Sequence, residues 1–330
     1  MNLQERKTLL ERLGIYMLEN DSEWQSVKRK AYSENQWFLP EFIDLAAKNI
    51  AERFISNRAL NELIERYHIP AEIPAPKKIG IVMAGNIPMV GFHDLLCVIM
   101  SGHYALVKTS SKDQVLISHL VQKLKQWNPE APVNMGDMIK GCDAYIATGS
   151  NNSSRYFEYY FSRFPHIIRK NRTSVAVLTG KETREELEKL ADDVYLFFGL
   201  GCRNVTSILV PEGYDFIPLL EAFRKYNHLA ENHKYKNNYD YNLAMHILNN
   251  TYYMTNGSIL LVEDASPFSR ISQLHYSYYT NEQEARDSLK NNGDIQCVVN
   301  EGSTRFGQSQ VPGICDYADG VDTMAFLKVL

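Results

Sequence analysis

The feature that most constrains the fold is an alternation of apolar and helical segments between residues 79 and 178. Four short apolar runs are predicted to be strands, at residues 79–84, 104–107, 144–147 and 174–178. Helical segments are predicted between them, at residues 90–100, 113–127 and 151–164. Such alternation predicts right-handed βαβ units, in which helices pack on a parallel sheet. The expected fold class is therefore α/β.

Polar residues stand where the predicted strands end. Asn86, Lys108 and Ser150 each follow one of the first three strands. Ligands of open parallel sheets bind at the carboxyl ends of the strands, so we expect a binding site there. Gly149-Ser150 also leads into a helix, whose N–H groups suit a phosphate. The chain has no G-x-G-x-x-G motif, so it either binds no dinucleotide or binds one in another way.

Cys202 is the second constraining feature. It follows Gly199-Leu200-Gly201, between a helix predicted to start at the capping box Thr183–Glu186 and an apolar strand at residues 205–210. Glycines permit a sharp turn, and a thiolate there is a nucleophile whose pKa nearby N–H groups lower. The alternative interpretation is a small buried hydrophobe, as free cysteines commonly are. The local sequence leaves both open.

Length and composition narrow the function classes. The 330 residues are too many for one ordinary core, and a net charge of −4 without long charge runs disfavours nucleic-acid partners. Five scattered cysteines without a C-x-x-C pair argue against a disulfide framework and a metal site. No signal peptide or membrane span is predicted, so a cytoplasmic location is expected. The sequon Asn204-Val205-Thr206 is then incidental.

Other segments carry simpler expectations. Residues 1–70 are predicted to be helical, and Ser111 is the expected cap of the helix at 113–127. The polar segment 233–242 is expected to be a loop, either a lid or a solvated surface segment. The apolar tail 324–330 is a candidate interface strand. His93 and His103 are expected to be hydrogen-bonded polar groups near the sheet edge rather than catalytic residues.

Four motifs in this order resemble the aldehyde dehydrogenase superfamily: Gly85-Asn86-Ile87-Pro88, Lys108, Thr148-Gly149-Ser150 and Gly201-Cys202. Within it the chain is similar to the acyl-CoA reductases related to the long-chain fatty-acid reductase of bacterial bioluminescence. Segments 235–242 and 316–327 also carry the resemblance. It implies a Rossmann-like parallel-sheet cofactor domain and an α/β catalytic domain, with the active site in the cleft between them. The expected division is a helical region at 1–75, a nicotinamide-cofactor domain at 76–178, and a catalytic domain with C-terminal tail at 179–330.

The resemblance also implies roles for individual residues. Cys202 would be the nucleophile, and the Asn86 side chain and the Cys202 N–H would stabilise the oxyanion. Lys108 would bind a ribose of the cofactor, with Gly149 and Ser150 near its pyrophosphate. Ser111, followed by Lys112, stands where the superfamily often has a ribose-binding glutamate. Loss of that carboxylate favours NADPH, with NADH as the alternative.

Two departures from the superfamily pattern narrow the chemistry. The stretch Arg169-Lys170-Asn171-Arg172 replaces the E-L-G-G motif, whose glutamate activates water in hydrolytic members. Ser266 replaces the glutamate of the E-x-F-G-P motif, which positions the cofactor. The first loss fits an acyl-enzyme resolved by hydride.

The predicted function is therefore NADPH-dependent reduction of an acyl-CoA, with a fatty acyl group favoured, to the aldehyde. The resemblance adds an acyl-transferring partner enzyme and a homo-oligomer as expected partners. Three alternatives stay open: a cofactor-free cysteine acyltransferase or thioesterase assisted by His228, His233 or His275, an acyl phosphate reductase, and a non-catalytic scaffold with the same fold.

Overall fold

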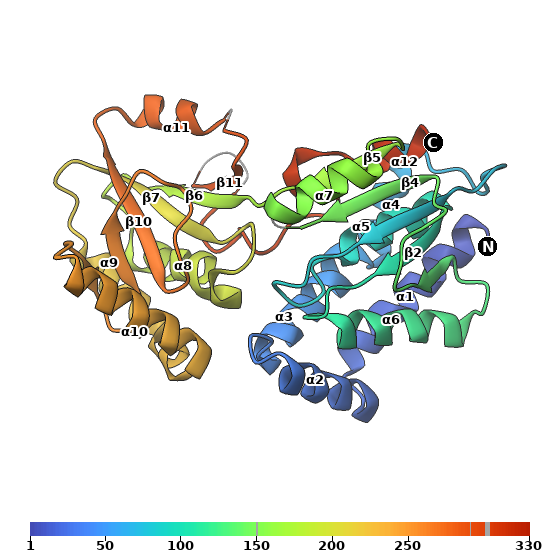
Figure 1. The fold of residues 1–330 in the computed structure, drawn as a ribbon, viewed down its shortest axis with the longest axis horizontal. Coiled ribbons are helices and arrows are strands. Elements are labelled where there is room, and N and C mark those ends of the chain that lie inside the picture. Colours follow the sequence, from blue (N-terminus) through green and yellow to red (C-terminus); the bar gives the residue numbers. More distant parts are fainter. Residues whose placement is uncertain (150, 291, 301–303) are drawn as a thin grey trace. The chain divides into compact units, whose positions relative to one another are not determined.

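The chain folds into two compact units, seen in a computed structural model that describes residues 1–149, 151–290, 292–300 and 304–330 (Figure 1). Unit 1 comprises residues 1–171 and 312–330, and unit 2 comprises residues 172–311. These bounds differ from the expected boundaries at 75 and 178. The N-terminal helices and the tail pack with the first sheet, whereas the strand at 173–177 pairs with strands of unit 2. No helix in the described ranges combines the length and apolarity needed to cross a bilayer.

Unit 1 is built on a five-stranded parallel sheet in the order β3-β2-β1-β4-β5. Its strands are β1 (Lys78–Val82), β2 (Tyr104–Lys108), β3 (Val133–Met135), β4 (Ala144–Thr148) and β5 (His166–Arg169). Val82 lies opposite both Lys108 and Ala147 in the register. The carboxyl ends of β1, β2 and β4 therefore meet at one edge, as the alternation predicts.

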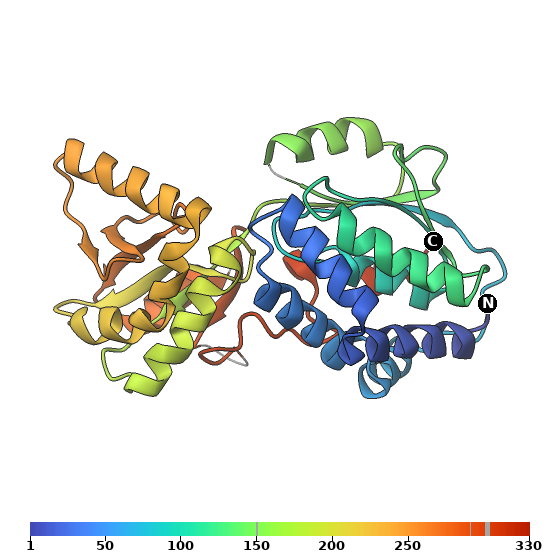
Figure 2. The same ribbon diagram turned by 90° about the horizontal axis from the view of Figure 1, so that it is seen from below.

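Helices cover both faces of this sheet. They are α1 (Leu3–Glu19), α2 (Ser22–Glu34), α3 (Pro40–Asn49), α4 (Asn57–Tyr67), α5 (Phe92–Ser101), α6 (Gln114–Trp127) and α7 (Asn151–Phe161), with a short π-helix at Ile50–Phe54. In Figure 2, α7 lies on the opposite side of the sheet from α6 and α1. Nine of the ten residues of α5 are buried, because α5 packs between the sheet and further helices. This explains its nearly continuous apolar sequence.

The C-terminal segment returns to unit 1 and ends in α12 (Thr323–Lys328). The expected interface strand at 324–330 is wrong, because Met324 and Leu327 are buried in a helix that packs on α5. His103 holds this end: its Nδ1 accepts the N–H of Lys77 at 3.1 Å, so its Nε2 donates to the carbonyl of Leu327 at 3.0 Å. His93 bonds the carbonyl of Ile314 at 2.7 Å. Both histidines are the hydrogen-bonded polar groups that we expected.

Unit 2 contains a six-stranded sheet in the order β11-β6-β7-β10-β9-β8, parallel except for the β8–β9 pair. The strands are β6 (Thr173–Val177), β7 (Val205–Pro211), β8 (Met254–Thr255), β9 (Leu260–Glu263), β10 (Gln273–Tyr279) and β11 (Ile295–Val299). The helices are α8 (Arg184–Tyr195), α9 (Ile217–Ala222), α10 (His233–Leu248) and α11 (Glu282–Lys290), with 3-10 turns at Leu196–Gly199, Phe223–Glu231 and Ala318–Gly320, the last of these in unit 1. Figure 1 shows α11 on one side of the sheet and α8, α9 and α10 on the other.

Two local expectations are wrong in these elements. The segment 233–242 is not a loop but the first part of α10, where Tyr235, Tyr239 and Asn242 are buried at helical spacing. Asn232 starts the helix by accepting the N–H groups of Lys234 and Tyr235. The second error is at α6, whose N-cap is Asp113 and not Ser111.

Candidate active site

Helix α8 delivers the chain to Cys202 through a strained turn. The helix starts at Thr183, which forms the expected capping box with Glu186. Phe197 and Phe198 then have φ values of 55° and 57°, and Gly199 has 72°. Left-handed backbone costs a non-glycine residue roughly 1–2 kcal/mol. Both aromatic side chains are buried, and the ring of Phe198 lies 5.5 Å from that of Tyr235. Burial of these rings offsets the strain.

Cys202 is the second residue of a tight turn that Asn204 closes. The N–H of Asn204 donates to the carbonyl of Gly201 at 3.1 Å, and its side-chain oxygen accepts the N–H of Gly201 at 2.8 Å. The buried Ser174 hydroxyl, on β6, donates to the carbonyl of Cys202 at 3.0 Å. Peptide groups on both sides of Cys202 are thus held by side chains of unit 2. The Asn204 side chain is wholly buried, which supports the interpretation of its sequon as incidental.

The exposure of Cys202 helps to choose between the two interpretations of its thiol. Cys97 and Cys142 are buried, and burial raises the pKa of both thiols. Cys202 is only half-buried. A buried thiol with a raised pKa is inert, whereas an accessible thiol at a tight turn can meet a substrate. The geometry therefore favours the nucleophile over the buried hydrophobe.

Other groups of unit 2 gather at the edge where β7 begins. The hydroxyl of Thr206, the second residue of β7, donates to the carbonyl of Pro267, which brings the neighbouring Ser266 to this edge. His275, on β10, bonds the carbonyl of Ser266 at 2.9 Å. The thiol of Cys297 lies 3.1 Å from the Ser174 hydroxyl. Ser266 therefore stands near the start of the strand that follows Cys202, whereas His228 and His233 are exposed on helical segments.

The predicted site residues of unit 1 lie at the carboxyl edge of its sheet. Lys108 ends β2 and is exposed, and Asn86 is half-buried in the loop after β1. Gly149 follows β4, where a side-chain Cβ would come within 2.9 Å of both Ser153 and Phe157, so only glycine fits. Ser111 and Lys112 are exposed in the turn before α6. Ser150 lies outside the described residues.

The Asn86 loop and the 110–113 turn pack directly against each other. A Cβ on Gly85 would lie 2.7 Å from that of Ser110. The carboxylate of Asp113 accepts the N–H of Met89, a left-handed residue, at 2.7 Å. Burial raises the pKa of Asp113 well above its ordinary value. The loop of Asn86, predicted to bind the oxyanion, therefore packs on the turn of Ser111, predicted to lie near the cofactor ribose. The carboxyl group of Asp113 between them is buried.

Arg169, where the superfamily base would stand, is a buried structural cation. Its guanidinium pairs with Asp94 of α5 at 2.8 Å and donates to the hydroxyl of Thr323 at 2.7 Å. It also donates to the carbonyl of Ala318. Burial acts to raise the pKa of Asp94, but the charge and hydrogen bonds of Arg169 hold it below its ordinary value. This position holds the end of β5 to α5 and to the C-terminal segment, and it supplies no base.

Asp193, on α8, accepts the N–H groups of Gly307 and Ser309 at 2.7 and 2.9 Å. Burial raises its pKa to about 6. A raised carboxyl pKa means that the folded protein binds the proton more tightly than the unfolded chain. Its contribution to the free energy of unfolding therefore falls as pH rises from about 4 to about 6.

We expect the Asp193→Asn variant to lose this pH dependence. Relative to the variant, the wild-type protein should lose about 2 kcal/mol of unfolding free energy between pH 4 and pH 7, because most of the shift in the pKa of Asp193 falls within this range. Urea unfolding across this range measures the difference. Asp240→Asn, an exposed change on α10, is the control. Parallel stability curves for wild type and Asp193→Asn would refute the assignment.

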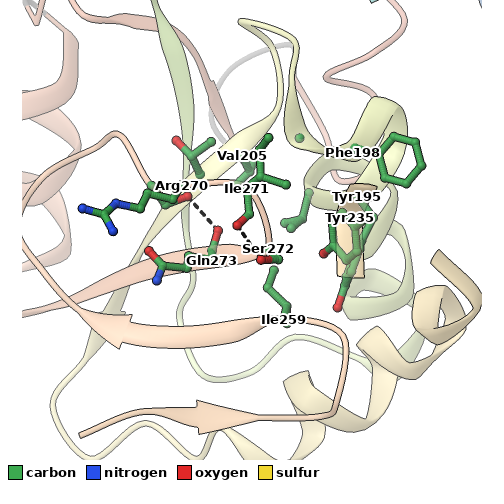
Figure 3. A pocket seen from close by; sticks show the side chains of 13 residues that line it. Tyr195, Phe198, Val205, Tyr235, Ile259, Arg270, Ile271, Ser272 and Gln273 are labelled. Carbon is green, nitrogen blue, oxygen red and sulfur yellow. Dashed lines mark hydrogen bonds between the residues drawn. The ribbon is translucent and has the colours of Figure 1, made fainter. Parts of the chain in front are cut away.

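A cavity beside the Cys202 turn in unit 2 is too small for a substrate. It lies between the end of α8, the start of β7, Tyr235 and residues 269–273 (Figure 3). Its volume of about 20 Å³ holds roughly one water molecule. An acyl chain therefore does not occupy it. No group of three or more metal-ligating side chains occurs within the described ranges, so no metal site is assigned there.

Sequence reasoning missed several residues that shape these sites. Asn204 and Ser174 hold the Cys202 turn, and Asp94 partners Arg169. For Asn204 the local signal was only its place beside a glycine-rich turn, since asparagine is common in turns. For Ser174 and Asp94 none existed, since their partners are 28 and 75 residues away.

Comparison with known proteins relates part of the chain to one family. Residues 71–216 match the family model described as acyl-CoA reductase (LuxC). The matched segment contains Asn86, Lys108, Gly149 and Cys202. No curated protein matches the chain.

Solved structures of aldehyde dehydrogenases share the fold. The chain is similar to succinic semialdehyde dehydrogenase from Streptococcus pyogenes, in complex with NADP+, with a TM-score of 0.67 and 13% identity over 92% of this chain and 77% of that chain. It is also similar to aldehyde dehydrogenase 21 from Physcomitrella patens, with a TM-score of 0.66 and 14% identity over 92% and 74%. A third similar structure is an indole-3-acetaldehyde dehydrogenase complexed with NAD+. Its TM-score is 0.65 and its identity is 13%, over 91% of this chain and 72% of that chain. The chain thus shares the fold of aldehyde dehydrogenases, and its residues 71–216 match the acyl-CoA reductase (LuxC) model.

Proposed function

We propose that the protein is an NADPH-dependent acyl-CoA reductase that forms an acyl-enzyme on Cys202. The observation that carries the proposal is the half-buried thiol of Cys202, on a turn that the side chains of Asn204 and Ser174 hold by hydrogen bonds. The replacement of the water-activating glutamate by the buried Arg169 supports reduction over hydrolysis. We further propose a fatty acyl substrate, an acyl-donating partner enzyme and a homo-oligomer, following the family relationship.

In the proposed mechanism the Cys202 thiolate attacks the thioester carbonyl of the acyl-CoA. A carbon–sulfur bond forms, and the side-chain amide of Asn86 donates a hydrogen bond to the developing oxyanion. The bond to coenzyme A then breaks, and its thiolate leaves with the electron pair. A nicotinamide cofactor, which Lys108 and the backbone at Gly149 would hold, would supply the hydride that reduces the acyl carbonyl. Cys202 departs as a thiolate and the aldehyde is released, and the free coenzyme A thiolate takes up the one proton of the overall reaction.

Several residues of unit 1 fit an anionic dinucleotide. Lys108 and Lys112 are exposed cations at or beside the carboxyl edge of the sheet, and Gly149 lets α7 start close to the end of β4. Residue 111 is a serine, and the carboxyl of Asp113 is buried with a raised pKa. Little negative charge would then oppose a 2′-phosphate. These features support the preference for NADPH over NADH.

An acylation trap tests the proposal. Acyl-CoA is added without nucleotide, and intact and peptide mass spectrometry locate the adduct; a series of acyl chain lengths identifies the preferred substrate. With NADPH the absorbance at the nicotinamide band should fall as aldehyde forms, faster than with NADH. Turnover without nucleotide would instead establish a thioesterase or acyltransferase. No adduct together with no nucleotide binding would establish a scaffold.

We expect Asn86→Ala to slow acyl transfer strongly. Loss of one oxyanion donor typically lowers the rate by about 10²–10³-fold. Because the interaction forms in the transition state, kcat should fall more than KM rises. Stopped-flow acylation measures the change. Asn61→Ala, which removes a half-buried side chain of α4 that donates to Asn57, is the control. An Asn86→Ala rate within about threefold of wild type would exclude this role.

A further inference from the structure

The end of α8 and the Cys202 turn meet at one buried side chain, Asn204. The last carbonyls of a helix have no partner within the helix and must be satisfied from outside. The side-chain amide of Asn204 donates to two such carbonyls, those of Asp193 and Val194, at 3.1 and 3.4 Å, and to the carbonyl of Leu196, the residue after the helix, at 2.8 Å. In Figure 1 this is the junction between α8 and β7. Asn204 therefore caps the helix.

The other end of the same amide group holds the turn that carries the thiol. Its oxygen accepts the N–H of Gly201 at 2.8 Å, directly before Cys202. Its backbone carbonyl accepts the N–H of Ser174 at 3.1 Å, which ties the turn to β6. A second contact to β6 lies two residues earlier, where the hydroxyl of Ser174 donates to the carbonyl of Cys202. The Asn204 side chain thus links α8 to the turn, and its backbone carbonyl links the turn to β6.

This arrangement restricts how Cys202 can move. The three left-handed residues Phe197, Phe198 and Gly199 lie between the carbonyls and the N–H that Asn204 joins. Loss of the amide removes four hydrogen bonds that bracket these residues, which favours their relaxation towards ordinary backbone conformations. A shift of about 1 Å in a reacting group can cost about 10² in rate.

We propose that Asn204 is the positioning residue of Cys202, holding its thiol in the geometry that acyl transfer needs. The inference rests on the proposed function, in which Cys202 is the nucleophile. Asn204 acts through the backbone of the turn and takes no part in bond making. Ser174 has the same role at the carbonyl of Cys202. Its hydroxyl makes one hydrogen bond to the turn, whereas the Asn204 side chain makes four to the turn and the helix end.

The test compares Asn204→Ala with Asn242→Ala. Asn242 is also a buried asparagine of unit 2, and its amide donates to the carbonyl of Ile271 at 2.9 Å rather than to the carbonyls at the end of α8. The acylation rate of Cys202 should fall about 10²-fold in Asn204→Ala, with KM for acyl-CoA changed by less than about threefold. Asn242→Ala should lose similar stability in urea unfolding but keep the acylation rate.

Hydrogen–deuterium exchange supplies a readout that does not depend on activity. Exchange in peptides covering residues 196–204 should become about tenfold faster in Asn204→Ala and stay unchanged in Asn242→Ala. If Asn204→Ala does not fold, Ser174→Ala takes its place, with an expected loss of about tenfold in acylation at constant KM. Faster exchange with an unchanged acylation rate would overturn the inference. A wild-type protein that forms no acyl adduct would overturn the proposed function instead, while the exchange comparison would still report the turn.

Discussion

Replacing Cys202 with alanine is expected to abolish formation of the acyl-enzyme and to lower aldehyde production by about 10⁴-fold or more, the order of loss on removing a covalent nucleophile. The physical reason is that no other group in the proposed mechanism forms the bond to the acyl carbon. The turn itself should survive, because its hydrogen bonds use the backbone of Cys202 and the side chains of Asn204 and Ser174. Circular dichroism and urea unfolding should therefore match wild type.

Two further cysteines sharpen this experiment. Cys297 lies at the same edge, with its thiol 3.1 Å from the Ser174 hydroxyl, and is the natural competitor for acylation. Cys315 is equally half-buried but belongs to unit 1. Cys315→Ala should acylate like wild type, and the mass of the adduct should map to the peptide with Cys202. If the adduct persists in Cys202→Ala and maps to Cys297, the nucleophile is Cys297 on β11 and not Cys202.

Replacing Arg169 with leucine is expected to destabilise unit 1 by about 3–5 kcal/mol, the range for removing one partner of a buried ion pair. The change leaves the carboxylate of Asp94 in the interior without its cation. It also removes the donors to the hydroxyl of Thr323 and the carbonyl of Ala318, which hold the C-terminal segment. Urea unfolding at pH 7 measures the loss.

The neighbouring Lys170 provides a matched control for the Arg169 variant. Its side chain is 60% exposed and pairs with Glu158, also exposed, at 3.2 Å. Lys170→Leu should cost less than about 1 kcal/mol, as exposed ion pairs do. Because Arg169 holds the pKa of Asp94 below its ordinary value, the pair stabilises above the unfolded pKa of Asp94 and loses this effect as pH falls. The Arg169→Leu deficit should therefore shrink in acid.

A deficit as small as that of Lys170→Leu would show that the buried pair is energetically neutral. A deficit that grows in acid would contradict the charge assignment. The double variant Asp94→Leu, Arg169→Leu should recover part of the loss, because an apolar pair leaves no buried charge. If Arg169→Leu or Asp94→Leu lost acylation without losing stability, the changed residue would have a catalytic role, contrary to its burial.

Local sequence pattern predicted much of the two sheets and the turn at Cys202. Strands β1, β2, β4, β6 and β7 were predicted within one or two residues, because their apolar runs are short and bounded by polar or glycine residues. Strands β3, β5, β8 and β10 were missed. The sequence Gln273–Tyr279 mixes polar and aromatic residues, and its side chains are buried by neighbouring strands rather than by its own pattern. The polar start of α10 was missed for the same reason, since Tyr235 and Asn242 are buried by distant partners.

The sequence by itself determined the α/β class, the polar residues at the ends of β1 and β2, and a glycine-rich turn carrying Cys202. Each of these depends on neighbours within a few residues, through strand length, turn geometry and helix capping. Only the tertiary structure decided that β6 joins the second sheet, that α12 returns to α5, and that Arg169 is a buried partner of Asp94. It also decided that Asn204 ties the Cys202 turn to α8. These outcomes depend on burial and on hydrogen bonds between segments far apart in the chain, and no local pattern records which distant group satisfies a buried polar atom.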